Sequence, residues 1–202
     1  MQIINADPTR MIDLPGVGPC PRPVEIDQSM TGFTRLKSLR IYRFQPGVTI
    51  NGDSEVDEVY IVPFGGRVDM NITGTTPVQA RLSAASAPRA LYMAPDHSYQ
   101  LTPVTESLVA YARAAATGRV PCHAVQGRGD ANAEFLSFTI ADLAAGDAMP
   151  TDGAKSRLVH IIAGSIVIEG QPVTETQTAA LSSGQSGLVQ ASSPTTLLMV
   201  SA

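Results

Sequence analysis

Short apolar stretches recur along this chain, and clusters of Gly, Pro, Asn, Asp and Ser separate them. Such runs, bounded by turn-forming residues, are typical of β-strands, because a helix needs a longer stretch in which apolar residues recur with a period of ~3.6 residues. The first half of the chain predicts strands at 39–44, 59–64, 67–72, 78–82, 89–93, 98–102 and 107–112. The second half predicts strands at 134–141, 157–163, 165–169, 172–180, 187–191 and 196–201. The pattern therefore indicates an all-β protein.

The same pattern of glycines bounding an apolar run occurs twice in the sequence. Phe44-Gln-Pro-Gly47 leads to an apolar run that ends at Gly65, and Leu143-Ala-Ala-Gly146 leads to one that ends at Gly164. The Gly-to-Gly distance is 18 residues in both copies, and the copies are 99 residues apart. Repetition at a fixed period indicates one structural unit written twice. We expect two jelly-roll barrels at 35–113 and 134–202, a linker at 114–133, and a Pro-rich irregular arm without helix at 1–34.

The repeated strands Val59-Tyr-Ile-Val62 and Leu158-Val-His-Ile-Ile162 are apolar on both faces. A strand with one solvent-exposed face alternates apolar and polar residues. An uninterrupted run of apolar residues therefore indicates that the outer face is also buried against other parts of the protein. The cover would be the other barrel or a second subunit. We expect the two barrels to pack together and the chain to form a homodimer in addition. Alternation then directs 157, 159 and 161 into the second barrel and His160 outward, to a packed and hydrogen-bonded position.

Charge and composition exclude some classes of binding partner. The net charge is −4, from 14 Lys and Arg against 18 Asp and Glu, and the basic residues are scattered, so a nucleic-acid partner is not expected. The N-terminus shows no secretory signal, and no apolar run approaches the ~20 residues of a membrane span, so we expect a cytoplasmic protein without membrane contact. Cys20 and Cys122 lie 102 residues apart, a spacing that favours neither a zinc site nor a redox pair. We expect structural thiols rather than a disulfide.

The first repeat has the residue spacing of a known pair of sequence motifs. The segment from Gly47 through Asp53 and Glu55 to Glu58-Val-Tyr-Ile-Val-Pro-Phe-Gly65 has the spacing of the first cupin motif, and Pro95-Asp-His-Ser-Tyr-Gln100 stands in place of the second. The chain thus resembles the cupin superfamily of RmlC-like jelly-roll barrels, whose motif histidines and glutamate bind metal. The resemblance maps only the glutamate onto this chain, as Glu58.

Within that superfamily, Thr31 to about Val125 is similar to the first domain of 5-deoxy-glucuronate isomerases of inositol catabolism. The similarity lies in the segments 39–47, 58–69 and 90–99. In that family three histidines and a glutamate of the second domain bind a divalent ion. The repeat alignment puts Asp152, Ala154 and Arg157 at such positions here, and 183–190 contains no histidine. The resemblance therefore implies a duplicated barrel that has lost this metal site, and we expect no cofactor.

Carboxylates of the first barrel are the sharpest candidates for a site. Asp53, Glu55 and Glu58, if they faced the interior with Gln100, would form an all-oxygen site suited to Mg, Ca or Mn. The alternative places Asp53 and Glu55 in a solvated turn and pairs Glu58 with Arg43 or Arg113.

Other polar residues would complete a ligand site. Tyr60 is a candidate in the first barrel, and Arg157 and Gln190 are candidates in the second. Arg157 would hold a carboxylate through two hydrogen bonds, or would instead neutralise Asp152 or Asp147. His97 is expected at the surface or barrel rim, and His123 beside Cys122 lacks a third residue to orient it as a catalytic base.

Three functions follow from these residues. The leading hypothesis is a degenerate duplicated cupin that binds a small polar, carbohydrate-derived ligand with little or no metal-dependent catalysis. The rival is a sugar-acid isomerase that uses Glu58 as general base. The third is a structural or regulatory protein that dimerises through its apolar outer strands and Pro-rich arm.

Overall fold

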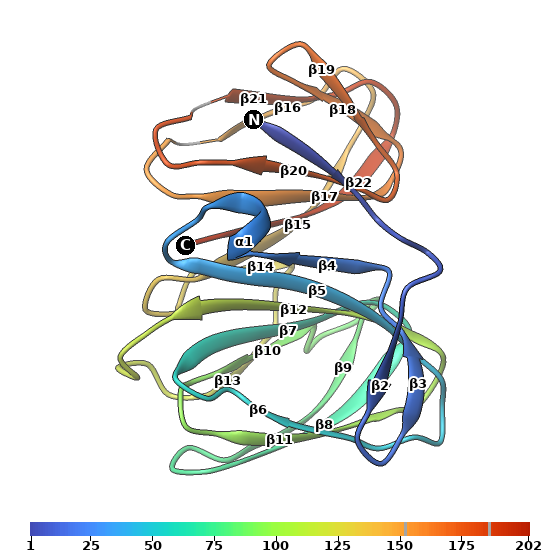
Figure 1. The fold of residues 1–202 in the computed structure, drawn as a ribbon, viewed down its shortest axis with the longest axis vertical. Helices are drawn as coiled ribbons and strands as arrows, with labels where there is room; N and C mark the ends of the chain where they lie inside the picture. The colour runs from blue at the N-terminus through green and yellow to red at the C-terminus, as the bar shows by residue number, and fades with distance from the viewer. Residues whose placement is uncertain (152, 186) are drawn as a thin grey trace.

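The computed structural model describes residues 1–151, 153–185 and 187–202. Two β-barrels are stacked along the long axis of the molecule (Figure 1). Each barrel combines a six-stranded sheet with a four-stranded sheet. The six-stranded sheets face each other in the middle of the molecule, and the four-stranded sheets lie at its two ends (Figure 1). The prediction of an all-β protein with two packed barrels is confirmed.

The first barrel contains the middle of the chain. Its six-stranded sheet has the order β13-β10-β7-β12-β5-β4, and its four-stranded sheet has the order β6-β11-β8-β9. The strands of the larger sheet are β4 (Val24–Asp27), β5 (Leu36–Phe44), β7 (Asp57–Gly65), β10 (Ala90–Met93), β12 (Ser107–Ala115) and β13 (His123–Val125). Those of the smaller sheet are β6 (Ile50–Asp53), β8 (Arg67–Thr73), β9 (Val78–Ser83) and β11 (Ser98–Pro103).

The second barrel repeats this arrangement. Its six-stranded sheet has the order β1-β20-β17-β22-β15-β14, and its four-stranded sheet has the order β16-β21-β18-β19. The strands of the larger sheet are β1 (Gln2–Asn5), β14 (Gly129–Asp130), β15 (Ser137–Leu143), β17 (Arg157–Ala163), β20 (Gln177–Leu181) and β22 (Thr195–Ser201). Those of the smaller sheet are β16 (Ala148–Thr151), β18 (Ser165–Ile168), β19 (Gln171–Thr174) and β21 (Gly187–Ala191).

The N-terminal segment differs from the expected irregular arm without helix, and that expectation was wrong. β1 pairs with β20 of the second barrel, whereas β4 pairs with β5 of the first. Between them, β2 (Met11–Leu14) and β3 (Gly18–Pro21) form a hairpin. Proline is tolerated in such a hairpin because an edge strand has N–H groups that no neighbour uses. The segment therefore ties the two barrels together.

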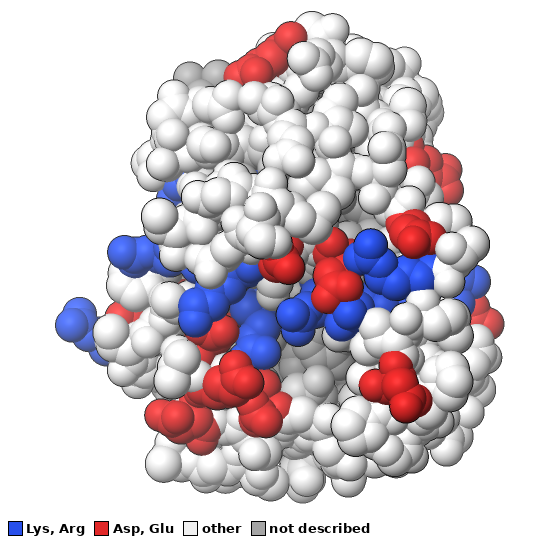
Figure 2. Space-filling view, viewed as in Figure 1, with Lys and Arg blue, Asp and Glu red and all other residues white. Residues whose placement is uncertain are grey.

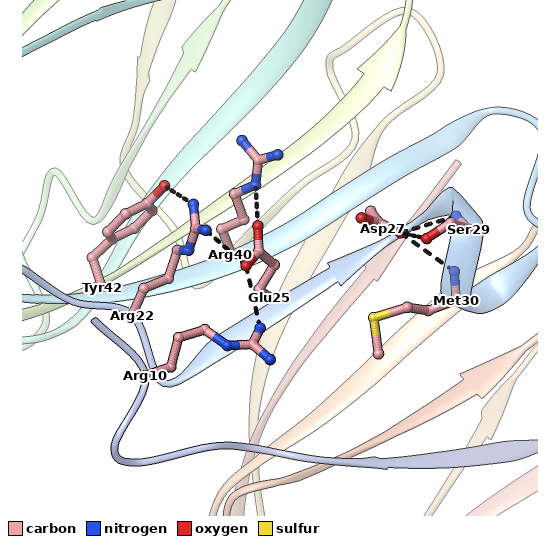
Figure 3. Close-up of polar contacts among 8 residues, drawn as sticks. All are labelled: Arg10, Arg22, Glu25, Asp27, Ser29, Met30, Arg40 and Tyr42. Atoms are coloured by element: carbon pink, nitrogen blue, oxygen red, sulfur yellow. Dashed lines mark hydrogen bonds and ion pairs between the residues drawn. The ribbon is translucent and has the colours of Figure 1, made fainter. Parts of the chain in front are cut away.

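A short helix, α1 (Gln28–Thr31), follows β4. It begins because the side chain of Asp27 accepts hydrogen bonds from the backbone N–H groups of Ser29 and Met30 (Figure 3). It ends at Gly32, which adopts a left-handed conformation with φ 69°.

The linker and one predicted strand also differ from expectation. Within 114–133, β13 pairs with β10 of the first barrel and β14 pairs with β15 of the second. The predicted strand 172–180 is divided between β19 in the outer sheet and β20 in the inner sheet. The break occurs at Thr176, whose φ of 68° no extended strand adopts.

Side-chain alternation separates two kinds of buried surface. Val159 and Ile161 belong to the aliphatic cluster inside the second barrel. Their neighbour Leu158, together with Leu198 and Val200, belongs instead to the cluster that contains the core of the first barrel. The outer face of the second barrel is therefore covered by the first barrel, which explains why β17 is apolar on both sides.

Two further predictions from the sequence concern the cysteines and membrane-spanning segments. Cys20 and Cys122 are both buried and free. No helix in the described part of the chain has the length and apolar character of a membrane span.

Gly66, rather than Gly65, is the structural counterpart of Gly164. Gly66 and Gly164 have φ values of 75° and 85°. A Cβ added to Gly66 would overlap the carbonyl oxygen of Glu106, and one added to Gly164 would overlap that of Pro194. Gly65 has no positive φ, and its Cβ would meet Leu108 Cβ at 3.4 Å. Gly47 and Gly146 share a positive φ at the expected distance of 99 residues, but Gly66 and Gly164 are 98 residues apart, so between these glycines the repeats shift by one residue from the alignment that the sequence suggested. In a strand, one residue moves a side chain to the opposite face.

We expect Gly66→Ala to destabilise the fold strongly and Gly65→Ala to have little effect. The first variant places a Cβ in a strained backbone conformation and against the carbonyl oxygen of Glu106. A loss of about 2 kcal/mol or more in the free energy of unfolding is expected for it. Urea denaturation of both variants measures the difference, and equal losses would contradict the assigned counterpart of Gly164.

His160 occupies the seam between the barrels, as the alternation predicted. Its ring is buried, its Nδ1 lies 2.9 Å from the Thr178 hydroxyl, and its centroid is 6.4 Å from that of Phe64 in the first barrel. Burial lowers the pKa of His160 from 6.5 to about 4. The ring is therefore neutral in the folded protein at neutral pH.

Stability should fall as the pH drops from 6.5 towards 4. Over this range the unfolded chain protonates His160 and the folded protein does not, so the full stability exists only above pH 6.5. The loss attributable to this ring is about 3 kcal/mol by the linkage relation. Urea midpoints measured across this range for the wild type and His160→Gln isolate it, since other groups titrate in both proteins. Parallel pH profiles would refute the assignment.

Candidate functional site

Glu58 does not face the interior of the first barrel; that placement was wrong. Its side chain is fully buried on the outer face of β7, at the seam. Its carboxylate accepts hydrogen bonds from the backbone N–H groups of Glu134, Phe135 and Leu136 at 2.9, 2.9 and 2.6 Å. Tyr92 donates a fourth from its hydroxyl at 3.0 Å. The expected pairing with Arg43 or Arg113 is absent, because backbone donors at the start of the second barrel satisfy the charge.

Tyr60 lies on the same outer face, two residues further along β7. Its hydroxyl donates to Asp130 Oδ2 at 2.8 Å, and its ring packs 4.9 Å from that of Phe138 in β15. His123 Nε2 lies 2.7 Å from the same Asp130 oxygen, and its Nδ1 lies 3.0 Å from the Pro121 carbonyl. Both ring nitrogens thus face acceptor oxygens, and the nitrogen that carries the proton donates to one of them. This network holds the barrels together.

The carboxylate of Asp130 is stabilised as an anion by that network. Burial alone would raise the pKa of Asp130, but hydrogen bonds from His123, the Asn132 N–H and Tyr60 outweigh it and hold the pKa below its usual value. Burial likewise keeps the pKa of Tyr60 far above its usual value, with the hydrogen bond to Asp130 adding to the effect.

The remaining acidic candidates do not converge. Asp53 and Gln100 are exposed on the outer face of the four-stranded sheet, where Gln100 donates to Asn51 at 3.4 Å. Glu55 sits in an exposed turn with a φ of 50°, and its carboxylate lies 3.5 Å from Arg113. The all-oxygen site proposed for these residues with Glu58 is therefore not formed.

His97 was expected at the surface or the barrel rim, and the structure contradicts a surface position. The ring is buried in the turn before β11. Its Nε2 accepts the backbone N–H of Thr76 at 3.1 Å, so Nδ1 carries the proton and donates to the Pro95 carbonyl at 2.7 Å. The residue is a neutral structural element.

In the second barrel the two candidates point in opposite directions. Arg157 is buried at the start of β17 and shares the inward face with Val159, and it donates to the Lys155 carbonyl at 3.2 Å. Gln190 is exposed on β21. Asp152, the expected partner of Arg157, lies outside the described residues. Asp147, the other, accepts the backbone N–H of Ala144.

A different set of polar residues faces the open end of the first barrel. Glu25, Arg40 and Tyr111 are direct neighbours across β4, β5 and β12, so their side chains share the inward face. Tyr42 follows on the same face of β5, and its ring centroid is 5.3 Å from that of Tyr111. Tyr99 of the opposite sheet lies 5.8 Å from Tyr111, which places these aromatic rings between the two sheets.

Arginines crowd around a single carboxylate at this end (Figure 3). Glu25 Oε2 lies 2.7 Å from Arg22 and 3.2 Å from Arg10, and Glu25 Oε1 lies 3.9 Å from Arg40. Arg22 also lies 3.4 Å from the Tyr42 hydroxyl. Nε of Arg22 and Nε of Arg40 are buried, and no acceptor in the described ranges hydrogen-bonds to either. The single carboxylate of Glu25 thus lies close to three guanidinium groups.

A second group of charges lies further along the same inward face. Asp57 forms an ion pair with Lys37 at 2.5 Å and another with Arg113 at 3.3 Å. Arg113 also donates to the Ser54 carbonyl. Counting both groups, cations outnumber carboxylates around the open end, although the whole chain carries a net charge of −4.

The surface shows this excess directly. A band of Lys and Arg side chains crosses the middle of the face drawn in Figure 2, and the surface below it is hollowed at the open end of the first barrel. Burial raises the pKa of Tyr99 to about 12 and that of Tyr111 well above its usual value, so both phenols stay protonated. The arrangement provides guanidinium and hydroxyl donors, which suits an anionic, hydroxylated ligand.

The residues present do not fit the divalent ion that the isomerase resemblance implies. No three His, Cys, Asp or Glu side chains come together as a metal site within the described residues. In the second barrel, Val159 and Ile161 fill the inward positions of β17 with aliphatic groups. A transition metal prefers imidazole, thiolate or carboxylate donors, which these are not.

The sequence profile of the KduI/IolB family matches residues 22–132, which is more than half of the chain. This chain belongs to the KduI/IolB family. The matched region contains the whole first barrel and most of the arginine group around Glu25. The resemblance to 5-deoxy-glucuronate isomerases is thereby confirmed at the level of the family. No curated protein sequence matches this KduI/IolB protein.

Solved structures agree on the fold. An IolB-like protein from Salmonella typhimurium superimposes with a TM-score of 0.72 at 13% identity, covering 100% of this chain and 92% of that one. The bacterial pirin YhhW from Escherichia coli, in complex with nickel(II), gives 0.69 at 12% identity with 99% and 98% covered. Oxalate decarboxylase from Bacillus subtilis gives 0.75 at 7% identity with 100% and 77% covered. The expected cupin architecture is confirmed.

Sequence reasoning missed the residues that line the open end. Arg40 and Tyr42 alternate with Leu39 and Ile41 on β5, and this alternation was a usable signal for an inward polar face. Arg22 gave no such signal, because only the folded N-terminal segment brings it to the barrel.

We expect Glu58→Gln to destabilise the protein by about 3 kcal/mol, because it replaces an anion that accepts backbone N–H groups with an amide that accepts through one oxygen only. Asp53→Asn is the matched control and should change stability by under about 0.5 kcal/mol, since Asp53 is exposed. Urea denaturation of both variants and the wild type measures these differences in the free energy of unfolding. Equal stability of Glu58→Gln and the wild type would contradict the structural role.

Proposed function

We propose that this protein binds a small carboxylate-bearing, hydroxylated molecule of the sugar-acid class at the open end of its first barrel. The observation that carries the proposal is the arrangement of Arg10, Arg22 and Arg40 around the single carboxylate of Glu25. Nε of Arg22 and Nε of Arg40 are buried donors without a hydrogen-bond acceptor among the described residues. A ligand carboxylate would reach the guanidinium groups of Arg10 and Arg40, whose side chains are 36% and 34% exposed.

Charge favours an anion at this place. A guanidinium is always protonated and presents a planar fork that matches a carboxylate. Arg22 is largely buried, with 14% of its side chain exposed, so its attraction to an anion is screened less than at an open surface. An anionic ligand would therefore gain both hydrogen bonds and charge neutralisation.

The aromatic residues suit the remainder of such a ligand. Tyr42 and Tyr99 are partly exposed, and their phenol groups would donate and accept hydrogen bonds with sugar hydroxyls, whereas Tyr111 is buried beside them. Their rings offer apolar faces to the ring carbons of the ligand. Membership of the KduI/IolB family supports the same ligand class.

Binding is better supported than isomerisation. A base that moves a proton must reach the ligand, and Glu58 instead faces the seam with its hydrogen bonds made. The carboxylates that do face the open end, Glu25 and Asp57, are each held by cationic side chains. The geometry therefore favours a binding protein that has the fold of an isomerase family.

The probe that tests this proposal is D-glucuronate, compared with neutral D-glucose by isothermal titration calorimetry. We expect the wild type to bind D-glucuronate in preference to D-glucose, and Arg22→Gln to weaken that binding about tenfold or more through loss of a charge-assisted hydrogen bond. Arg81→Gln is the matched control, because Arg81 pairs with Asp69 on the exposed outer sheet.

Glu25→Gln supplies a test in the opposite direction. Removal of the competing carboxylate should strengthen D-glucuronate binding, since the same arginines would then lack an anion. Thermal unfolding of each variant verifies that it is folded. The proposal fails if D-glucose binds as well as D-glucuronate, or if Arg22→Gln and Arg81→Gln behave alike.

A further inference from the structure

A second hollow lies on the seam between the barrels, on the face of β4 and β5 opposite to the arginine group. Its volume is about 220 Å³. Its walls are mainly apolar and come from both barrels and from the N-terminal segment: Pro8, Pro23, Ile41, Phe64, Leu108 and Ile162. We name this hollow the seam pocket.

The N-terminal segment closes one side of the seam pocket. The chain between β1 and β2 runs down the side of the molecule from the second barrel to the first (Figure 1). The backbone N–H of Ala6 donates to Thr176 of the second barrel at 3.1 Å, and that of Asp7 donates to Pro23 beside β4 at 2.8 Å. Hydrogen bonds to both sides hold this wall in place, so the pocket is a preformed feature of the fold.

His160 is the buried polar group that lines the pocket. The Thr178 hydroxyl is fully buried, and its hydrogen-bond partner within the described chain is His160 Nδ1 at 2.9 Å. The hydroxyl proton is satisfied when it is donated to Nδ1, which leaves the ring proton on Nε2. No acceptor for that Nε2–H is found among the described residues. Arg43, Glu175 and Thr176 also line the pocket, but they are exposed and lie at its rim. The buried part of the pocket therefore combines an apolar wall with the neutral donor of His160.

We propose that the seam pocket binds a compact, neutral and mainly apolar molecule that carries one hydrogen-bond acceptor, which accepts from His160 Nε2. The size is suitable, since a cavity of about 150 Å³ lined by apolar side chains binds benzene. A charged ligand is disfavoured, because it would lose its hydration against a neutral imidazole. Arg43 at the rim is paired with Glu106 at 3.4 Å, so it does not call for an anion.

The ligand class follows from the same contacts. Phe64 and Leu108 offer a surface on which a single aromatic or alicyclic ring packs. A carbonyl, ether or phenol oxygen on that ring would meet the donor. This site is separate from the arginine group, and the proposal does not rest on the function proposed above.

The experiment uses two probes of nearly equal shape, acetophenone and α-methylstyrene. The first carries a carbonyl oxygen where the second carries a methylene group. Each is titrated into the full-length protein, and the ring nitrogens of His160 and the methyl groups of Leu108 and Ile162 are followed by NMR. We expect both probes to shift the methyl signals, acetophenone alone to shift the Nε2 signal, and acetophenone to bind roughly fivefold more tightly.

Three variants make the test decisive. Leu108→Trp fills the pocket and should abolish binding of both probes, with Leu108→Phe as the milder version if the larger side chain prevents folding. His160→Phe should remove the preference for acetophenone while α-methylstyrene still binds. Leu188→Ala, which shortens an apolar side chain that is 52% exposed on β21 in the four-stranded sheet of the second barrel, is the control and should change nothing.

Several results would overturn the proposal. One is the absence of any shift at His160, Leu108 or Ile162 at the solubility limit of both probes. Another is equal affinity for the two probes in the wild type, which would deny a role to the donor. A third is unchanged binding in Leu108→Trp, which would place the probes elsewhere.

Discussion

The buried carboxylate of Glu58 is the point at which the two barrels are joined. Three consecutive backbone N–H groups, from Glu134 to Leu136, converge on its oxygens where the chain enters the second barrel. A buried anion is stable only when its hydrogen-bonding capacity is used, so this contact determines where the second barrel begins relative to β7. The rest of the seam, with Tyr60, Asp130 and His123, follows from that position.

Because the six-stranded sheets face each other, each must bury its outer surface. The outer faces are therefore apolar or hydrogen-bonded, apart from His160 Nε2 at the seam pocket, and they have a structural role. Polar residues that remain available for a ligand are left at the open end of the first barrel, on the inward faces of β4, β5 and β12. The second barrel carries no such group on β17 beyond Arg157, because aliphatic side chains fill the inward positions that follow.

The N-terminal segment contributes to both hollows. Its residues Arg10 and Arg22 bring positive charge to Glu25, and its backbone at Ala6 and Asp7 bounds the seam pocket. A segment that a sequence pattern describes only as Pro-rich thus helps to build each place where a ligand would fit. Its hydrogen bonds to both barrels explain why it is ordered.

Local patterns in the sequence were enough to predict the all-β class, the duplication and the burial of both faces of the central strands, because turn residues and apolar runs are local properties of the chain. The sequence also predicted His160 correctly, since alternation is reliable where a strand is regular. It misplaced Glu58, because Gly65 and Gly66 are adjacent and only the positive φ of Gly66 identifies the counterpart of Gly164. Tertiary structure alone gathered Arg10, Arg22 and Arg40 around Glu25. These residues come from separate segments, and their distances depend on how the N-terminal segment crosses the barrels, which no local pattern encodes.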